Sequence, residues 1–165
     1  PSSSRSRLLY DTDSSAPTDG ATGERPMAYD RNNVFARIVR GEIPAHTVFE
    51  DEHTLAFMDV MPQADGHTLV IPKAEAENLF DLPAPALAAT ILTTQRVARA
   101  VQKAFAAPGI LIAQLNGSAA GQSVFHLHFH VLPRHEGLDL RFHARGMADP
   151  TLLAAHAEKV RAAID

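Results

Sequence analysis

The sequence predicts an α+β fold: a sheet of about five antiparallel strands, a long helix packed on one face, and a C-terminal helix. Three features lead to this prediction. Short apolar runs with strand character are joined by short connections, one long segment repeats apolar residues every three or four positions, and strands do not alternate with helices. Without βαβ alternation, a doubly wound parallel sheet is disfavoured.

The first half of the chain predicts one short helix and three strands. A helix is expected over residues 34–40, because Phe35, Ile38 and Val39 share helical spacing and Gly41 follows as a stop. Short connections make the strands that follow antiparallel neighbours. They are expected at Thr47–Glu50, Thr54–Asp59 and Thr68–Pro72.

The second half predicts a long helix, two strands and a last helix. Asp81 is expected to cap the long helix, with Pro83 in its first turn, and Pro108 and Gly109 end it. The inward face of this helix is expected to hold Leu87, Ile91, Thr94, Ala98, Val101 and Phe105. The elements that follow are a strand at Ile110–Leu115, a loop at Asn116–Ser123, a strand with the histidines of Phe125–Leu132, and a helix from Asp149.

Composition indicates one globular enzyme-sized domain. The chain has 165 residues, 45% of them apolar, a net charge of −4 and no cysteine. This excludes a disulfide framework and argues against a general nucleic-acid surface, and no apolar run approaches membrane length, so cytoplasm is the expected location. Residues 1–26 are expected to be a disordered extension, and 27–165 the domain, with a tail from about residue 135.

His126, His128 and His130 alternate with apolar residues. In a strand this spacing places the three imidazoles on one face and Leu127 and Phe129 on the other. Imidazole titrates near neutrality, so such a row offers a nucleophile, proton carriers or metal ligands.

Three interpretations of the row remain open. It is a half-exposed strand that uses histidine as its polar residue, a metal site begun by His-x-His, or a site for nucleophilic chemistry on a phosphate. A metal site is the second choice, because there is no cysteine and the nearest downstream acids, Glu136 and Asp139, lie beyond Pro133.

The loop before the row suits an anion. Gly117 and Gly121 allow tight turns that bring backbone N–H groups close to a phosphate. Side-chain donors come from Asn116, Ser118, Gln122 and Ser123. The same composition is typical of an ordinary hairpin connection, so the case for function depends on the histidines beside it.

The run His126-Leu-His-Phe-His-Val-Leu132 resembles the signature of the histidine triad family, His-apolar-His-apolar-His-apolar-apolar, at every position. Gly121-Gln-Ser-Val124 precedes it as in the Hint-like branch, and the resemblance spans about residues 33 to 134. The other matching motifs are Phe35-x-x-Ile38, Gly41-Glu-Ile-Pro44, Phe49-Glu-Asp51, Leu55-Ala-Phe-Met-Asp59, Pro62-Gln-Ala64 and His67-x-Leu-Val-Ile-Pro-Lys73.

The resemblance implies a role for each matching residue. His128 would attack an α-phosphate and form a nucleotidyl-histidine, His130 would contact the phosphoryl oxygens, and His126 and His67 would hold the nucleophile's ring. Asn116, Gln122 and Ser123 would contact the phosphate and leaving group, with Ser123 helping to protonate the latter. Asp59 would bind the ribose hydroxyls. The base pocket would consist of Phe35, Ile38, Ile43, Phe57 and Val60.

The implied function is hydrolysis of purine nucleoside phosphoramidates or related adenylated compounds, without a metal or other cofactor. A Fhit-like dinucleoside polyphosphate hydrolase is the alternative enzyme, and a nucleotide-binding or scaffold protein the alternative of another class. The resemblance also implies a homodimer formed through the long helix and an edge strand.

Overall fold

The computed structural model describes residues 28–137 and 146–165. The expected extension, residues 1–26, and part of the tail from about 135 lie outside the described residues. In chain order the elements are α1 (Val34–Val39), β1 (Thr47–Glu50), β2 (Thr54–Met58), β3 (Thr68–Pro72), α2 (Ala84–Ala104), β4 (Gly109–Gln114), the 3-10 turn η1 (Ser118–Ala120), β5 (Phe129–Arg134) and α3 (Pro150–Ala163).

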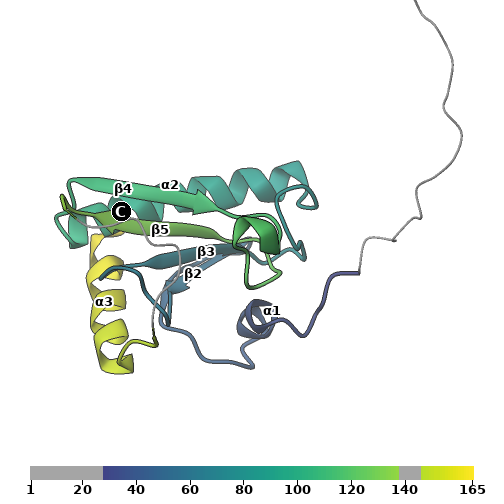
Figure 1. Ribbon diagram of the computed structural model, residues 1–165, viewed down its shortest axis with the longest axis horizontal. Helices are drawn as coiled ribbons and strands as arrows, with labels where there is room; N and C mark the ends of the chain where they lie inside the picture. Colours follow the sequence, from purple (N-terminus) through teal and green to yellow (C-terminus); the bar gives the residue numbers. More distant parts are fainter. Residues whose placement is uncertain (1–27, 138–145) are drawn as a thin grey trace, which may run out of the picture.

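The five strands form one antiparallel sheet in the order β1-β2-β3-β5-β4, which confirms the predicted α+β class. Figure 1 shows the long helix α2 running along this sheet, with α3 at one end and α1 near the other. Since β5 lies between β3 and the edge strand β4, His130 at the end of the histidine run lies on an inner strand of the sheet.

Each face of the sheet has its own apolar cluster. Alternate residues of β2 point to opposite faces: Ala56 and Met58 join the cluster with α2 and α3, while Leu55 and Phe57 join the cluster with α1. This burial on both faces explains why β2 and β3 are buried along their whole length. Helix α1 is thereby held over the sheet face that carries the histidines.

The start of α2 differs from the prediction. Pro83 is the N-cap residue and the helix begins at Ala84, so Asp81 does not cap it. Pro83 has ψ of 143°, outside the helical region, so Leu82 and Pro83 both precede the helix. Pro85 lies in the first turn instead, where its missing N–H costs no hydrogen bond.

The buried face of α2 agrees with the predicted one at Thr94 and Val101 and differs at Ile91, which is 45% exposed. Thr90 and Thr93, which were not predicted, are also buried. Thr90 and Thr94 satisfy their hydroxyls by donating to carbonyls one turn earlier, and the Thr93 hydroxyl bonds to that of Thr54 on β2. Burial of these three hydroxyls therefore costs little, and a pattern of apolar residues alone does not reveal that Thr90 and Thr93 are buried.

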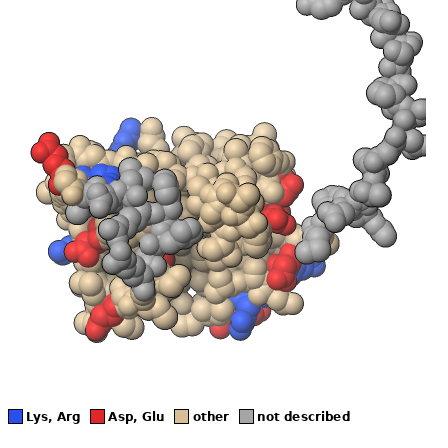
Figure 2. Space-filling view, in the orientation of Figure 1, with Lys and Arg blue, Asp and Glu red and all other residues tan. Residues whose placement is uncertain are grey.

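No helix in the described part of the chain is both long enough and apolar enough to cross a membrane. On the face shown in Figure 2, acidic and basic side chains lie scattered around the rim and do not gather in a basic band. This distribution agrees with the small negative net charge of the whole sequence.

Candidate active site

The histidine run enters the sheet later than its spacing predicts. The strand β5 begins at Phe129, so only His130 lies in a strand, while His126 and His128 precede it in irregular backbone. The alternation of faces nevertheless extends back to residue 126. Leu127 and Phe129 pack in the α2 cluster, whereas the rings of His126 and His128 contact Phe35 of α1.

Three polar residues converge at one end of the central strands. Asp59 follows β2, His67 precedes β3, and His130 lies in β5, where its register partner is Leu69. The antiparallel pairing of β2, β3 and β5 brings these positions together. The His67 ring is 1% exposed, and its Nε2 lies 2.9 Å from His130 Nδ1 and 3.5 Å from Asp59 Oδ2.

The hydrogen bonds of His67 determine which of its nitrogens carries the proton. The backbone N–H of Gln63 donates to His67 Nδ1 at 3.2 Å, so Nδ1 is an acceptor. The proton of the neutral ring therefore lies on Nε2, which donates to His130 Nδ1. Neutral His130 consequently carries its own proton on Nε2.

His128 is oriented by the main chain. Its Nδ1 lies 2.6 Å from the carbonyl oxygen of His126, and since a carbonyl only accepts, Nδ1 must donate. In the neutral ring this leaves a lone pair on Nε2. Edge-to-face contacts with Phe35 and His130, at ring-centroid distances of 5.0 and 4.9 Å, fix the plane of the ring.

His126 is bound at both ring nitrogens. Its Nε2 donates to the Pro72 carbonyl at 2.9 Å, and its Nδ1 accepts from the hydroxyl of Tyr29. Sequence reasoning missed Tyr29, because this residue precedes the first matching motif and stands in a polar segment without periodicity.

Burial favours the uncharged form of His67, His126 and His128. It lowers the pKa of His67 to about 3 and that of His126 to about 4, with the neighbouring His128 acting in the same direction. Burial also lowers the pKa of His128, against the opposing effects of its bond to the His126 carbonyl and of the Asp59 charge. The pKa of the Asp59 carboxyl is raised by burial, although the Met61 N–H bond opposes this.

Asp59, His67 and His130 offer ligand atoms within 4.8 Å of one another, close enough to surround a metal ion. The tautomer of His67 does not fit this use. A histidine that binds a metal through Nε2 carries a proton on Nδ1 and donates it to an acceptor, but here Nδ1 faces the N–H of Gln63. If Nε2 bound a metal, the N–H at His67 Nδ1 would face the N–H of Gln63, and neither donor would have an acceptor.

The loop before the histidines is held by its own amide side chains. Gln122 Oε1 accepts from the Gly117 N–H at 2.7 Å, and its Nε2 donates to the Glu77 carbonyl at 2.7 Å. Asn116 Oδ1 accepts from the Leu79 N–H at 2.8 Å. The structure thus assigns both amides a part in shaping the loop, and their contact with a nucleotide stays a prediction.

Ser123 is exposed and lines a cavity of about 830 Å³ together with Tyr29 and Phe125. Gly117 and Gly121, with φ of 83° and 95°, provide the turns that place the loop here. Of the predicted phosphate and leaving-group residues, Ser123 lines this cavity, whereas Asn116, Gln122 and the triad histidines do not.

The predicted base pocket is brought together only in part. Phe35, Ile38 and Phe57 lie in the α1 cluster, with the rings of Phe35 and Phe57 edge to face at 5.4 Å. Ile38 and Ile43 line a cavity of about 260 Å³, whereas Val60 is 48% exposed. These residues remain predicted contacts of the base.

The family model of the HIT domain matches residues 40–137, more than half of the chain. The chain belongs to the histidine triad (HIT) family. The matched segment contains His67 and all three histidines of the triad.

Relatives and solved structures agree with this membership. An Arabidopsis thaliana adenylylsulfatase, HINT3, is 32% identical over 136 residues, which cover 82% of this chain and 69% of that protein. A HIT-like protein from Bartonella henselae involved in cell-cycle regulation superposes with a TM-score of 0.78 at 48% identity, covering 83% of this chain and all of that one.

Two further solved structures bear on ligands. A histidine triad nucleotide-binding protein from Sulfolobus tokodaii has a TM-score of 0.72 at 31% identity, covering 78% of this chain and 89% of that one. A zinc-bound histidine triad family protein from Mycobacterium smegmatis has a TM-score of 0.71 at 41% identity, covering 80% of this chain and 92% of that one. This HIT protein therefore belongs to a superfamily of nucleotide-binding proteins.

Proposed function

We propose that this HIT protein hydrolyses purine nucleoside phosphoramidates or related adenylated compounds through a nucleotidyl-histidine on His128. The observation that carries the proposal is the 2.6 Å contact between His128 Nδ1 and the His126 carbonyl. It places the proton on Nδ1 and leaves the Nε2 lone pair for attack, while burial keeps this ring uncharged at neutral pH.

The reaction proceeds in two displacements. In the first, His128 Nε2 forms a bond to the α-phosphorus, the bond from phosphorus to the leaving nitrogen or oxygen breaks, and the leaving group takes a proton that the Ser123 hydroxyl relays from solvent. In the second, water attacks the same phosphorus and loses a proton to solvent, the N–P bond breaks, and His128 returns to its neutral form with the nucleoside monophosphate released.

Charge on the phosphoryl oxygens is stabilised by placed donors. In this scheme His130, whose proton the His67 bond fixes on Nε2, donates that proton in a hydrogen bond to a phosphoryl oxygen. The N–H groups of Gly117, Gly121 and Gln122 already donate within the loop, so in this scheme the loop contributes the hydroxyl of Ser123. No step of this scheme requires a divalent ion.

The remaining contacts select the nucleoside. Asp59 Oδ1 accepts from the Met61 N–H at 2.8 Å, which holds the carboxylate so that Oδ2 can accept from a ribose hydroxyl. The apolar residues Phe35, Ile38 and Ile43 would enclose the base. The name of the Arabidopsis relative supports a substrate with an adenylyl group, because an adenylylsulfatase also acts on an adenylylated acid.

The decisive experiment traps the intermediate. The protein is mixed with adenosine 5′-phosphoramidate, quenched early in alkaline denaturant because phosphohistidine bonds are labile in acid, and digested for mass spectrometry. An added AMP on the peptide that carries His128 is expected. His128→Ala should lose both adduct and turnover, whereas the exposed-site control His53→Ala should keep both; an adduct on another residue contradicts the proposal.

A Fhit-like reaction is the second candidate, because the cavity of about 830 Å³ beside Ser123 leaves room for a bulky leaving group such as a second nucleotide. Turnover of the phosphoramidate and of diadenosine polyphosphates by one preparation distinguishes the two. A nucleotide-binding or scaffold role would instead predict that His128→Ala leaves the cellular function intact.

We further infer that the protein is a homodimer. Apolar side chains are exposed on neighbouring elements, Ile91 and Leu92 on α2 and Ile112 on the edge strand β4. Pairing of these surfaces would cover the unpaired edge of β4. Light scattering should give about twice the chain mass of 17.8 kDa, and a monomer contradicts the inference.

A further inference from the structure

The backbone that orients the nucleophile receives no support from a strand ladder. Strand β5 starts at Phe129, so the carbonyl of His126 lies outside the sheet pairing. One main-chain bond holds this stretch, from the Leu127 N–H to the Ala76 carbonyl at 2.8 Å. The two bonds of the His126 ring therefore do the positioning that a strand would otherwise provide.

Tyr29 supplies one of these two bonds. Its hydroxyl donates to His126 Nδ1, and the two rings meet edge to face at a centroid distance of 5.7 Å. The other bond, from Nε2 to the Pro72 carbonyl, ties His126 to the end of β3. His126 is thus fixed from both sides, and its carbonyl in turn accepts from His128.

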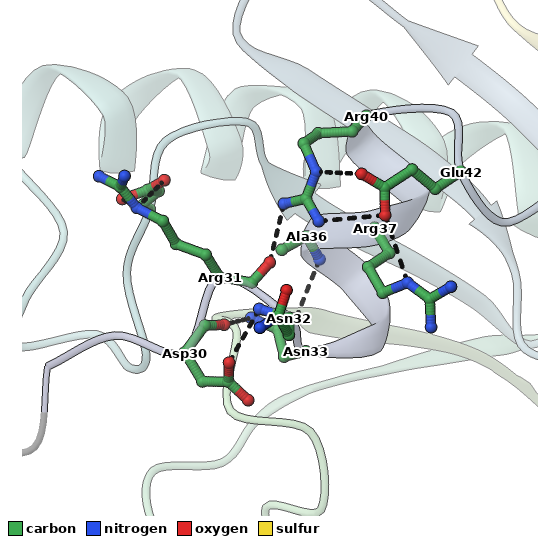
Figure 3. A network of polar contacts seen from close by, with 9 residues as sticks. Asp30, Arg31, Asn32, Asn33, Ala36, Arg37, Arg40 and Glu42 are labelled. Atoms are coloured by element: carbon green, nitrogen blue, oxygen red, sulfur yellow. Dashed lines mark hydrogen bonds and ion pairs between the residues drawn. The ribbon is translucent and has the colours of Figure 1, made fainter.

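The segment that carries Tyr29 is anchored immediately after this residue. Figure 3 shows that the Asp30 carboxylate accepts from the Asn32 N–H at 2.8 Å, and the Asp30 carbonyl accepts from Asn33 Nδ2 at 2.7 Å. Asn33 then caps α1 through the Ala36 N–H at 2.9 Å. The turn before α1 therefore has one defined conformation.

Two arginines extend this anchor to the rest of the domain. Arg40 donates to the Arg31 carbonyl at 2.8 Å, as Figure 3 shows, and is itself held by Glu42 at 2.7 Å. Arg31 pairs with Glu75 at 3.0 Å. Tyr29 is consequently delivered to His126 from a segment fixed at several points.

We propose that Tyr29 is a positioning residue for the nucleophile: through His126 it holds His128 in the ring orientation and tautomer required for attack. The expected loss of kcat rests on the proposed function, whereas the orientation and tautomer of His128 do not. Burial raises the pKa of Tyr29, so its hydroxyl stays protonated and able to donate at neutral pH.

The test replaces Tyr29 by phenylalanine, which keeps the ring and removes only the hydroxyl. Loss of one positioning hydrogen bond should lower kcat about threefold to tenfold and leave KM within about twofold. Thr94→Val is the matched control, because it removes one buried hydroxyl that bonds a helix carbonyl in α2, and it should leave kcat unchanged. Arg40→Ala, which frees the Arg31 carbonyl, should lower kcat in the same direction but less.

A second readout does not depend on turnover. Nitrogen-15 spectra of the histidine rings report which ring nitrogens carry protons, and Tyr29→Phe should shift the signals of both His126 and His128. Unchanged His128 signals overturn the proposal, as does a kcat loss no larger than that of Thr94→Val. If wild-type protein turns over no substrate, the proposed function fails and the spectra alone decide the role of Tyr29.

Discussion

His67 donates a hydrogen bond from Nε2 to Nδ1 of His130 at 2.9 Å, across the pairing of β3 with β5. The direction of this bond follows from the main chain, because the Gln63 N–H occupies the other nitrogen of His67. A backbone group outside the triad thereby places the proton of His130 on Nε2. The whole arrangement of protons in the site is set by main-chain atoms of Gln63, Pro72 and His126 and by Tyr29.

His67→Ala should slow the chemical step. Without the Nε2 donor, His130 no longer holds its own proton on the nitrogen proposed to face the phosphoryl group. A hydrogen bond to a charged group is worth about 1.5–3 kcal/mol, so kcat should fall about tenfold to a hundredfold with KM little changed. Steady-state kinetics beside the control His53→Ala checks this, and an unaltered kcat in His67→Ala would refute the role of the pair.

Removal of divalent metals should leave activity intact. The Gln63 N–H donates to His67 Nδ1, and this bond disfavours a cation held by Asp59, His67 and His130. With a metal on Nε2, the ring would carry a proton on Nδ1 that points at the Gln63 N–H. Turnover measured after dialysis against a strong chelator should equal that of the untreated protein. Loss of turnover that only zinc restores would show that the hydrogen bonds of His67 rearrange around a metal.

The acid limb of the activity profile should lie below pH 6.5. His128 attacks only when unprotonated, and burial lowers its pKa from the ordinary value of 6.5. kcat/KM for a substrate that does not titrate in this range should stay level through neutral pH, then fall about tenfold per pH unit below the pKa of His128. A half-maximal point at or above pH 6.5 would contradict the burial argument.

Sequence patterns predicted the sheet, the helices and the row of His126, His128 and His130, because alternation and helical spacing directly reflect which side chains are buried. His67 came only from the resemblance to the histidine triad family. These patterns could not predict that strand β5 begins at Phe129. Side chains point to alternate faces both before and after this residue, so alternation does not show where the strand hydrogen bonds start. The role of Tyr29 was not predicted, for a different reason. Its contact with His126 joins positions 97 residues apart, and no local spacing encodes it. The cap lies at Pro83, whose ψ of 143° is outside the helical region, and the capping preference of Asp81 alone did not locate it.

Stability should fall as the pH falls below 6.5. Folding lowers the pKa of His126 to about 4 and that of His67 to about 3, from 6.5 in the unfolded chain. Between these values the unfolded chain binds more protons, so the contribution is complete above pH 6.5 and is lost toward pH 4 and below. Each ring should cost on the order of 2 kcal/mol at pH 5.

Urea unfolding at pH 7 and pH 5 measures this loss directly. His67→Gln removes one of the rings whose pKa is lowered on folding, so its stability should depend less steeply on pH than that of the wild type. The variant control is His53→Gln, which removes an exposed histidine and should keep the wild-type slope. Equal slopes for wild type and His67→Gln would show that His67 does not contribute to the acid sensitivity.

Gly66→Ala should destabilise the turn that places His67. Gly66 has φ of +88°, and a Cβ there would lie 2.6 Å from Cδ2 and Cε2 of the Phe105 ring at the end of α2. Backbone strain of about 1–2 kcal/mol and overpacking of about 1–3 kcal/mol should both appear in urea unfolding. Gly66→Ala combined with Phe105→Leu separates the two, because a smaller side chain relieves only the clash. The pair should therefore show a favourable coupling energy in a double-mutant cycle, and strictly additive losses would mean that the ring moves aside without cost.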